Sequence, residues 1–187
     1  MNVLLNITGF FLFVFTLICL LLFIVNLLIF FFKKRDFPRK TLTVTIIATA
    51  AFLGIFVYIQ YFFTFDVINK EYMQEGPQLV LSPTGKYTAN AYYEPYGGAG
   101  PSGGVHVWVE ITNNEDKITK TVYYADAKNQ FFMDWLDEDT LSIVNKDEKP
   151  DTDRSIALTV EKEIYHENGL ACKSVLMKND YETCYQN

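Results

Sequence analysis

Three glycines in the sequence have the spacing of a dinucleotide-binding loop. Gly98, Gly100 and Gly103 form the pattern GxGxxG within YGGAGPSGGV, residues 96–105. In dinucleotide-binding proteins this loop follows a strand and opens a helix, and the N-terminus of that helix holds the pyrophosphate. Here the glycines are followed by VHVWVEI, whose alternation predicts a strand, and Pro101 lies inside the pattern. We therefore expect a loop between two strands and no bound nucleotide.

Aromatic side chains and a histidine flank this glycine loop. Three tyrosines come before it, and the strand predicted after it places a histidine and a tryptophan on one face. Loops between strands often carry binding residues, because a rigid scaffold positions them. We expect a ligand-contacting lip that consists of Tyr92, Tyr93, Tyr96, His106 and Trp108.

Residues for acid–base or nucleophilic catalysis are sparse. The chain has two histidines, and His106 is predicted on the polar face of a strand, where a surface role is commoner than catalysis. No serine lies in a GxSxG turn or another recognisable nucleophile setting; the five serines are Ser82, Ser102, Ser142, Ser155 and Ser174. The sequence therefore favours a protein that is not an enzyme. An envelope hydrolase that uses His106 or Asp134 is the alternative.

Two groups of carboxylates could act as acid and base or hold a metal ion. The first group consists of Asp134, Asp137, Glu138 and Asp139. Its sequence is first of all typical of a charged turn. The second group offers hard oxygen donors, which suit calcium: Asp147, Glu148, Asp151 and Asp153. Because the order of an EF-hand loop and its glycine are missing, we expect no metal and no cofactor.

The later part of the chain has turn residues between short segments of strand-like sequence, a pattern typical of antiparallel β structure. Residues 82–85, SPTG, have Ser, Pro and Gly at the preferred positions of a type I turn, so strands should flank them. In VHVWVEI, Val105, Val107, Val109 and Ile111 face one way, which predicts a half-buried strand. NNED forms the next turn, and further strands are predicted at ITKTVYY, QFFMDW, TLSIV and SIALTV. We expect an antiparallel sheet or a small sandwich.

The C-terminal segment after Glu161 leaves two alternatives open. A hairpin could close at Asn168 and Gly169, or a short helix could follow Gly169.

The first 65 residues predict two membrane-spanning helices. No charged residue occurs from Val3 to Phe32, and a second apolar run extends over about 42–63 and ends in aromatic residues. The basic stretch KKRDFPRK between them contains a proline and predicts a turn. A cleaved signal peptide is the alternative for the first run, but its positive charges follow the apolar residues. Ala50 and Gly54 are expected to pack against the first helix, with a partner protein as the alternative.

The distribution of basic residues predicts the orientation. The loop 33–41 holds five Lys and Arg residues, whereas none precedes the first apolar run. Because positive loops remain in the cytoplasm, both termini should be extracytoplasmic. Residues 66–77 would form a linker and 78–187 a β-rich extracytoplasmic domain in a bacterial membrane protein.

The predicted outer part is acidic. Five of the 16 Lys and Arg residues and one of the 22 acidic residues precede Asp66, which leaves 11 basic and 21 acidic residues and a formal charge of −10. This charge disfavours nucleic acid and anionic lipid as partners of the domain. It suits cations or basic surfaces, although solubility is the simpler explanation.

The three cysteines have different predicted roles. Cys19 lies in the first apolar run and is expected to fill space there. Cys172 and Cys184 lie outside, where disulfides persist. One helix over both would separate them by about 18 Å, beyond the reach of about 7 Å for a disulfide, but a turn at residues 178–180 would bring them together. We expect a disulfide, with two free thiols as the alternative.

Five blocks of sequence follow one another after residue 81. They are SPTGKYTANAYYEPYGGA, GGVHVWVEI, TVYYADA, FFMDWLDEDTLSIVN and IYHENGLACKSVLM. In this series the chain resembles an uncharacterised family of small membrane proteins from Gram-positive bacteria, domain of unknown function 5412. The resemblance covers most of residues 81–187. It implies a bacterial membrane setting and brings no activity, cofactor or catalytic residue.

These observations favour a membrane-anchored extracytoplasmic module that acts by binding, with the lipid bilayer and an envelope protein as partners. The alternatives are the envelope hydrolase and a small structural membrane subunit whose outer domain stabilises an assembly.

Overall fold

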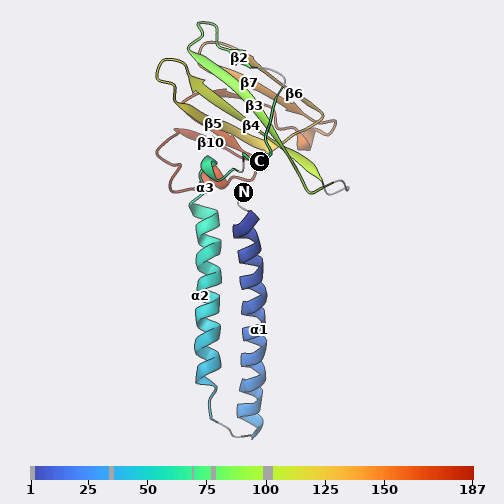
Figure 1. Ribbon diagram of the computed structural model, residues 1–187, viewed down its shortest axis with the longest axis vertical. Helices are drawn as coiled ribbons and strands as arrows, with labels where there is room; N and C mark the ends of the chain where they lie inside the picture. Colours follow the sequence, from blue (N-terminus) through green and yellow to red (C-terminus); the bar gives the residue numbers. More distant parts are fainter. Residues whose placement is uncertain (1–2, 34–35, 69, 77–78, 99–102) are drawn as a thin grey trace. The chain divides into compact units, whose positions relative to one another are not determined.

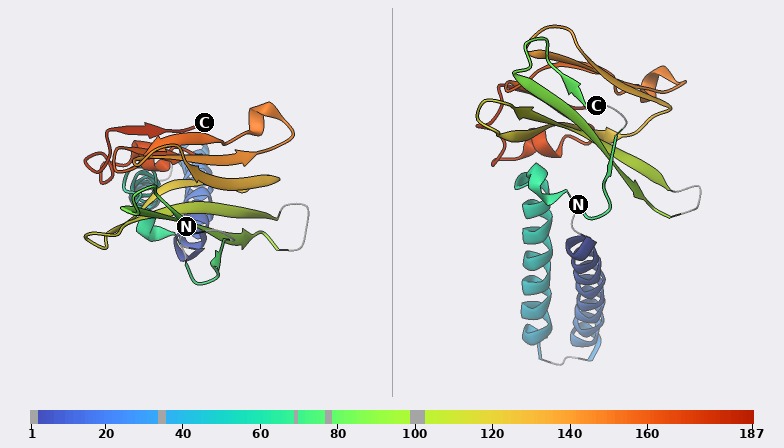
Figure 2. Two further views of the ribbon diagram at one scale, coloured as in Figure 1. Left: turned by 90° about the horizontal axis from the view of Figure 1, so that it is seen from above. Right: turned by 45° about the horizontal axis from the view of Figure 1, so that its top comes forward.

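The computed structural model describes residues 3–33, 36–68, 70–76, 79–98 and 103–187. The chain divides into two compact units, Met1–Phe62 and Phe63–Asn187. The first unit contains two helices, α1 (Val3–Lys33) and α2 (Arg39–Tyr61) (Figure 1). The second unit is built mainly from β-strands (Figures 1 and 2).

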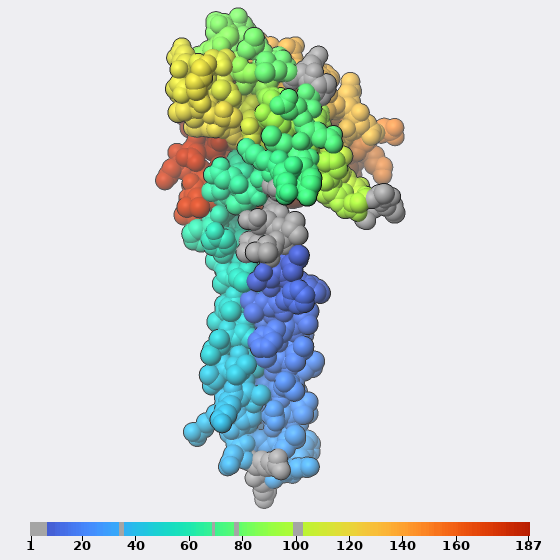
Figure 3. Space-filling view, viewed as in Figure 1, coloured from blue at the N-terminus to red at the C-terminus, as the bar shows by residue number. Residues whose placement is uncertain are grey.

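Helices α1 and α2 lie side by side within the first unit (Figure 3). The Thr45 hydroxyl donates a hydrogen bond to the carbonyl oxygen of Cys19 at 3.2 Å, and both residues are buried. Ala48 is also buried, whereas Ala50 and Gly54 are exposed. The expected packing through Ala50 and Gly54 is therefore wrong. The small side chains of Thr45 and Ala48 allow the close approach instead, and Thr45 adds a hydrogen bond between the helices.

Both helices are long and apolar enough to cross a membrane, with candidate spans Ile7–Lys33 and Arg39–Tyr61. Most of their apolar side chains are exposed, as in Phe10 at 64% and Ile47 at 63%. Helix α2 begins at Arg39, before the expected residue 42, and Pro38 immediately precedes it with a φ of −76°.

The strands of the second unit form two sheets. The large sheet has the order β1 (Gln74–Glu75), β3 (Tyr87–Tyr96), β4 (Gly104–Asn113), β5 (Thr119–Asp126), β9 (Glu163–His166) and β10 (Thr183–Tyr185), and β2 (Val80–Leu81) also pairs with β3. The small sheet has the order β6 (Gln130–Trp135), β7 (Thr140–Lys146) and β8 (Ile156–Thr159). Pairing is antiparallel except where β9 runs parallel to β5 and to β10. The mainly antiparallel β structure is thus confirmed.

The predicted turns and strands occur where the sequence places them. The amide of Gly85 donates to the carbonyl oxygen of Ser82 at 2.8 Å, and this turn joins β2 to β3. Gly85 has a φ of 77°, a conformation that glycine adopts without a steric penalty. The predicted strands at ITKTVYY, QFFMDW, TLSIV and SIALTV correspond to β5, β6, β7 and β8.

The core lies between the two sheets. Val107, Val109 and Tyr123 of the large sheet share one cluster with Leu141 and Leu158 of the small sheet, and all five are fully buried. Each buried aliphatic side chain of this size contributes about 1.5–3 kcal/mol relative to exposure. The alternation of apolar residues in β4 and β7 therefore decides which face of each sheet points inward.

A segment that we call the strap, residues 63–68 and 70–76, crosses the outer face of the large sheet. It contains η1 (Phe65–Val67) and β1, and so occupies most of the segment expected as a linker. The Phe63 ring lies 4.9 Å from the ring of His166 in β9, and Lys70 Nζ lies 2.6 Å from Glu110 Oε1 in β4. Trp108 lies on the same face of β4 as Glu110, and it is 0% exposed. The prediction of a half-buried β4 is wrong for the middle of the strand, where Trp108 and Glu110 on the polar face are buried, whereas His106 on that face is 27% exposed.

The C-terminal segment follows the second alternative. Gly169 has a φ of 66° and precedes the short helix α3 (Leu170–Lys173). Cys172 and Cys184 form the expected disulfide, with a Cα–Cα distance of 5.2 Å. A turn over residues 175–180 reverses the chain between them.

Candidate functional site

The structure divides the expected lip between the two faces of the large sheet. Tyr93 points into the core, where its ring contacts Phe131 at 5.7 Å. Trp108 stacks on Tyr92 at 5.8 Å and is fully buried. Tyr93 and Trp108 are therefore packing residues in this conformation. Their binding role stays a prediction, and Tyr96 and His106 are the members that reach solvent together.

Tyr96, His106 and Asp126 form what we call the rim cluster, on the outer face of β3, β4 and β5. The ring of His106 stacks on that of Tyr96 with centroids 4.0 Å apart. Strand pairing places Asp126 opposite His106, and His106 Nδ1 lies 2.9 Å from Asp126 Oδ1. The side chains of His106 and Asp126 are 27% and 40% exposed, so solvent reaches both.

Glycines beside the rim cluster allow the Tyr96 ring to lie flat against the chain. A Cβ atom at Gly104 would lie only 2.5 Å from the Tyr96 hydroxyl oxygen, so a larger residue would displace this ring. A shallow pocket of about 490 Å³ adjoins the ring and is lined by Pro95, Tyr96, Gly97, Gly98, Gly103, Gly104 and Val105. Gly100, Pro101 and Ser102 lie outside the described residues. Because strand β4 begins at Gly104, the helix that a dinucleotide-binding loop needs is not formed there.

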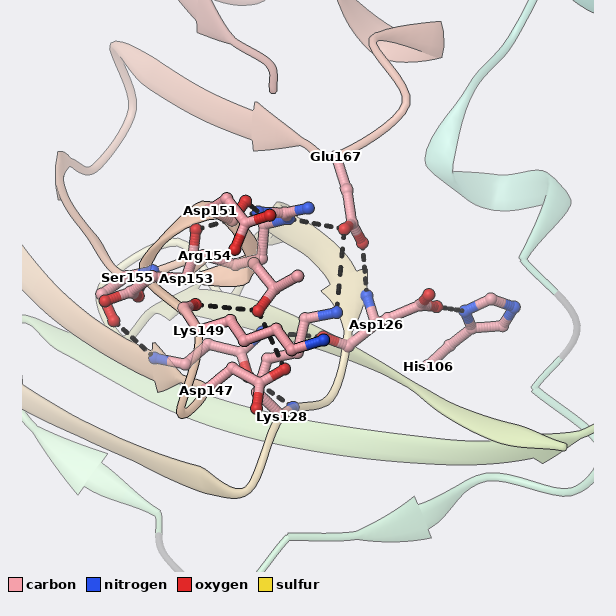
Figure 4. A network of polar contacts seen from close by, with 12 residues as sticks. His106, Asp126, Lys128, Asp147, Lys149, Asp151, Asp153, Arg154, Ser155 and Glu167 are labelled. Carbon is pink, nitrogen blue, oxygen red and sulfur yellow. Dashed lines mark hydrogen bonds and ion pairs between the residues drawn. The ribbon is translucent and has the colours of Figure 1, made fainter. Parts of the chain in front are cut away.

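A network of ion pairs anchors the strand that carries Asp126 (Figure 4). The amide of Asp126 donates to Glu167 Oε2 at 2.7 Å. Arg154 Nε donates to Glu167 Oε1 at 2.5 Å, and Lys128 Nζ lies 4.0 Å from the same oxygen. The side chains of Arg154, Glu167 and Lys128 are only 10%, 13% and 15% exposed. Charged hydrogen bonds at this degree of burial hold β5 in a fixed position beside His106.

Asn145 extends the network between the sheets. Its side-chain Nδ2 donates to the Tyr123 hydroxyl at 2.8 Å and to the Asp126 carbonyl oxygen at 2.9 Å. Its side-chain Oδ1 accepts from the backbone N–H of Lys128 at 2.8 Å. Asn145 is 0% exposed. These bonds join β7 of the small sheet to the end of β5, and so fix the backbone from which Asp126 projects.

The electrostatics of the rim cluster follow from this geometry. When the Nδ1 hydrogen of His106 is donated to Asp126, Nε2 is left as a hydrogen-bond acceptor or base. Burial raises the pKa of Tyr96, and the nearby Asp126 carboxylate raises it further. Tyr96 therefore remains protonated at neutral pH. The cluster can accept a proton or a hydrogen bond through His106 and offer an aromatic face through Tyr96.

Three of the candidate serines, Ser82, Ser155 and Ser174, form hydrogen bonds within the fold. The Ser82 hydroxyl donates a hydrogen bond to the Glu138 carboxylate, and the Ser174 hydroxyl donates one to the Phe63 carbonyl oxygen. The Ser155 hydroxyl accepts a hydrogen bond from the backbone N–H of Asn145. Asp134 lies in β6 opposite Ser142, on the small sheet and apart from His106 in the large one.

The acidic loop is also stabilised by its own backbone. Asp147 accepts from the Glu148 amide, which lowers the pKa of its carboxyl, and Asp153 accepts from Ser155 with the same effect. Within the described part of the chain, no three His, Cys, Asp or Glu residues stand close enough to hold a metal ion.

Sequence reasoning missed Asp126, Glu167 and Arg154. Asp126 ends a predicted strand, but its position opposite His106 depends on the register of β4 and β5. Glu167 lies 13 residues from Arg154 and 41 from Asp126, so its contacts with both depend on the tertiary fold. The one signal available was an acidic residue at the end of the predicted strand that follows, in the sequence, the strand with His106.

Comparisons with known proteins give a family and no closer relative. No curated protein and no solved structure matches the chain. The model of a family of unknown function, DUF5412, matches residues 10–167, which include most of α1, all of α2 and the strands β1 to β9. The chain therefore belongs to the DUF5412 family of unknown function.

Proposed function

We propose that the protein is a membrane-anchored extracytoplasmic binding module whose ligand contacts the rim cluster. The observation that carries the binding role is the solvent-accessible His106, held by Asp126 at 2.9 Å and stacked on Tyr96 beside a pocket. A fixed hydrogen-bonding group next to an aromatic face is typical of small recognition sites.

The membrane anchor is supported by both ends of the chain. Two helices with exposed apolar surfaces are long enough to span a bilayer, and the basic residues lie in the segment between them. The disulfide between Cys172 and Cys184 favours an oxidising compartment for the β unit. Together these features support a cytoplasmic loop with both termini outside.

The chemistry of the rim cluster restricts its ligand. His106 Nε2 and the Asp126 carboxylate both accept hydrogen bonds, and Glu94 lies opposite His106 on β3. A ligand with hydrogen-bond donors, neutral or cationic, therefore fits better than an anion. The ring of Tyr96 would contact its apolar or flat part.

Site-specific crosslinking in intact cells tests this proposal. A photoreactive phenylalanine analogue would replace Tyr96, and as a control Tyr185, which is 38% exposed on the edge strand β10. We expect an adduct at position 96 and not at 185. His106→Ala should reduce the adduct about tenfold, which corresponds to one lost hydrogen bond of about 1.4 kcal/mol. Equal adducts at both positions, or no effect of His106→Ala, would refute a ligand site here.

The His106–Asp126 pair also gives the hydrolase a specific observation. A carboxylate that orients a histidine is the base arrangement of many hydrolases. Turnover of ester or cell-wall substrates by the purified full-length protein, lost in His106→Ala, would favour an enzyme. Adduct formation at position 96 without turnover would favour the binding module.

A further inference from the structure

The loop that follows α3 presents two adjacent aliphatic side chains to solvent. Val175 and Leu176 are 55% and 52% exposed, whereas the next residue, Met177, is buried in the core. Adjacent exposed aliphatic side chains leave apolar area in contact with water, and contact with an apolar partner would remove that area from water. Packing within the protein therefore does not explain why the loop Lys173–Lys178 exposes these two side chains.

Hydrogen bonds hold this loop in one conformation. Ser174 is fully buried, and its Oγ accepts from the amides of Leu176 at 3.2 Å and Met177 at 3.4 Å. The preceding residue but one, Cys172, is fixed by the disulfide. Because Ser174 closes the turn from inside, the side chains of Val175 and Leu176 are directed outward by the fold.

The same serine ties the loop to the start of the strap. Ser174 Oγ donates to the carbonyl oxygen of Phe63 at 2.5 Å. Helix α2 ends at Tyr61, so only Phe62 separates Phe63 from the last helical residue. Two peptide steps cover at most about 8 Å. Covalent continuity thus keeps the loop close to the point where the chain leaves α2.

The end of α2 has the composition of a membrane interface. Tyr58, Tyr61 and Phe62 are all exposed, and aromatic residues of this kind lie at the headgroup level of a bilayer. The hydrogen bond between Ser174 and Phe63 therefore ties the loop to the residue that directly follows this aromatic segment in the chain.

Positive charge flanks the two aliphatic residues. Lys173 and Lys178 are both exposed, and neither forms an ion pair with any described residue. Residues 66–187 carry a formal charge of −10, so a segment with a lysine at each end of an aliphatic pair is locally more positive than the unit as a whole. Lysine side chains extend their ammonium groups toward lipid phosphates while their aliphatic stems remain among apolar groups.

We propose that the loop Lys173–Lys178 is a second membrane-contacting element, in which Val175 and Leu176 enter the outer lipid interface and the two lysines contact anionic phosphate groups. This proposal rests on the membrane anchor of the proposed function and is independent of the ligand site. It qualifies the expectation that the acidic domain avoids anionic lipid, because the contact is local.

Spin-label accessibility tests the proposal in the full-length protein. A nitroxide would be attached at Leu176→Cys in a Cys19→Ala background, in vesicles of phosphatidylcholine and phosphatidylglycerol. Leu136→Cys is the matched control, because Leu136 is 64% exposed but lies in a turn of the small sheet. Ile47→Cys, on an exposed face of α2, reports whether the helices are in the bilayer.

We expect the nitroxide at Leu176 to collide more with oxygen and less with a water-soluble nickel chelate than the one at Leu136. Lys173→Gln with Lys178→Gln should reduce this difference in phosphatidylglycerol vesicles and leave it unchanged in pure phosphatidylcholine. If the nitroxide at position 47 is in lipid and the nitroxide at position 176 is in water, the proposal is overturned and the membrane anchor stands. If Ile47 also reports water, the anchor and this proposal both fail, whereas crosslinking at Tyr96 is a separate result.

Discussion

His166 is a buried histidine whose two ring nitrogens have no hydrogen-bond partner among the described residues. It is 1% exposed and packs against the rings of Phe63, Phe65 and Tyr124. Burial in this aromatic environment lowers its pKa from 6.5 to about 4. Acidification should therefore destabilise the β unit before its carboxylates are protonated.

The magnitude follows from the difference in proton binding. Between pH 6.5 and pH 4 the unfolded chain binds a proton at His166 that the folded protein does not, so stability falls as the pH falls. At about 1.4 kcal/mol per pKa unit, the full loss below pH 4 is about 3 kcal/mol. Between pH 7.5 and pH 5 the loss is about 2 kcal/mol.

Urea unfolding of the full-length protein in detergent micelles measures this effect. The two tryptophans, Trp108 and Trp135, both lie in the β unit, so their fluorescence reports its unfolding. In His166→Phe the ring packing is kept and the titrating group removed. We expect the variant to lose about 2 kcal/mol less than the wild type between pH 7.5 and pH 5. Because other titrating groups are shared, an identical loss in both proteins would refute the reasoning.

Two further perturbations test the packing of the β unit in the same assay. Replacing both Cys172 and Cys184 by Ser opens a loop with a sequence separation of 12 and should cost up to about 3 kcal/mol, whereas an unchanged urea midpoint would show that the disulfide constrains little. Asn145→Ala removes three buried hydrogen bonds between the sheets and should cost about 3 kcal/mol. Ser142→Ala on the same strand should change stability by less than about 0.5 kcal/mol, and equal effects of these two substitutions would contradict the bridging role of Asn145.

Local patterns were sufficient for most elements of the fold. A run of thirty uncharged and mostly apolar residues predicts a long helix, and α1 forms over Val3–Lys33. The alternation in VHVWVEI and the turn residues of SPTG likewise determine β4 and the β2–β3 turn. The disulfide was also predictable, because a polar turn between Cys172 and Cys184 reverses the chain.

The rim cluster could not be predicted in the same way, because it depends on a β-bulge. Between Val109 and Glu110 the register of β4 and β5 shifts by one residue. Without this shift, the pairing of Thr112 with Thr119 would place Ala125 opposite His106. The bulge instead brings Asp126 opposite, and a one-residue shift of register leaves no signal in the sequence.

The burial of the outer face of the large sheet has a similar origin in long-range structure. His166 is covered in part by Phe63 and Phe65, which the strap brings onto the sheet. A fragment that begins at Asp66 would lack Phe63 and Phe65, the two phenylalanine rings on His166. Its His166 would regain contact with water, and its pKa would return toward 6.5, so the pH dependence of stability should weaken. Phe63 and Phe65, which follow α2 closely in the sequence, are thus part of the packing of the β unit.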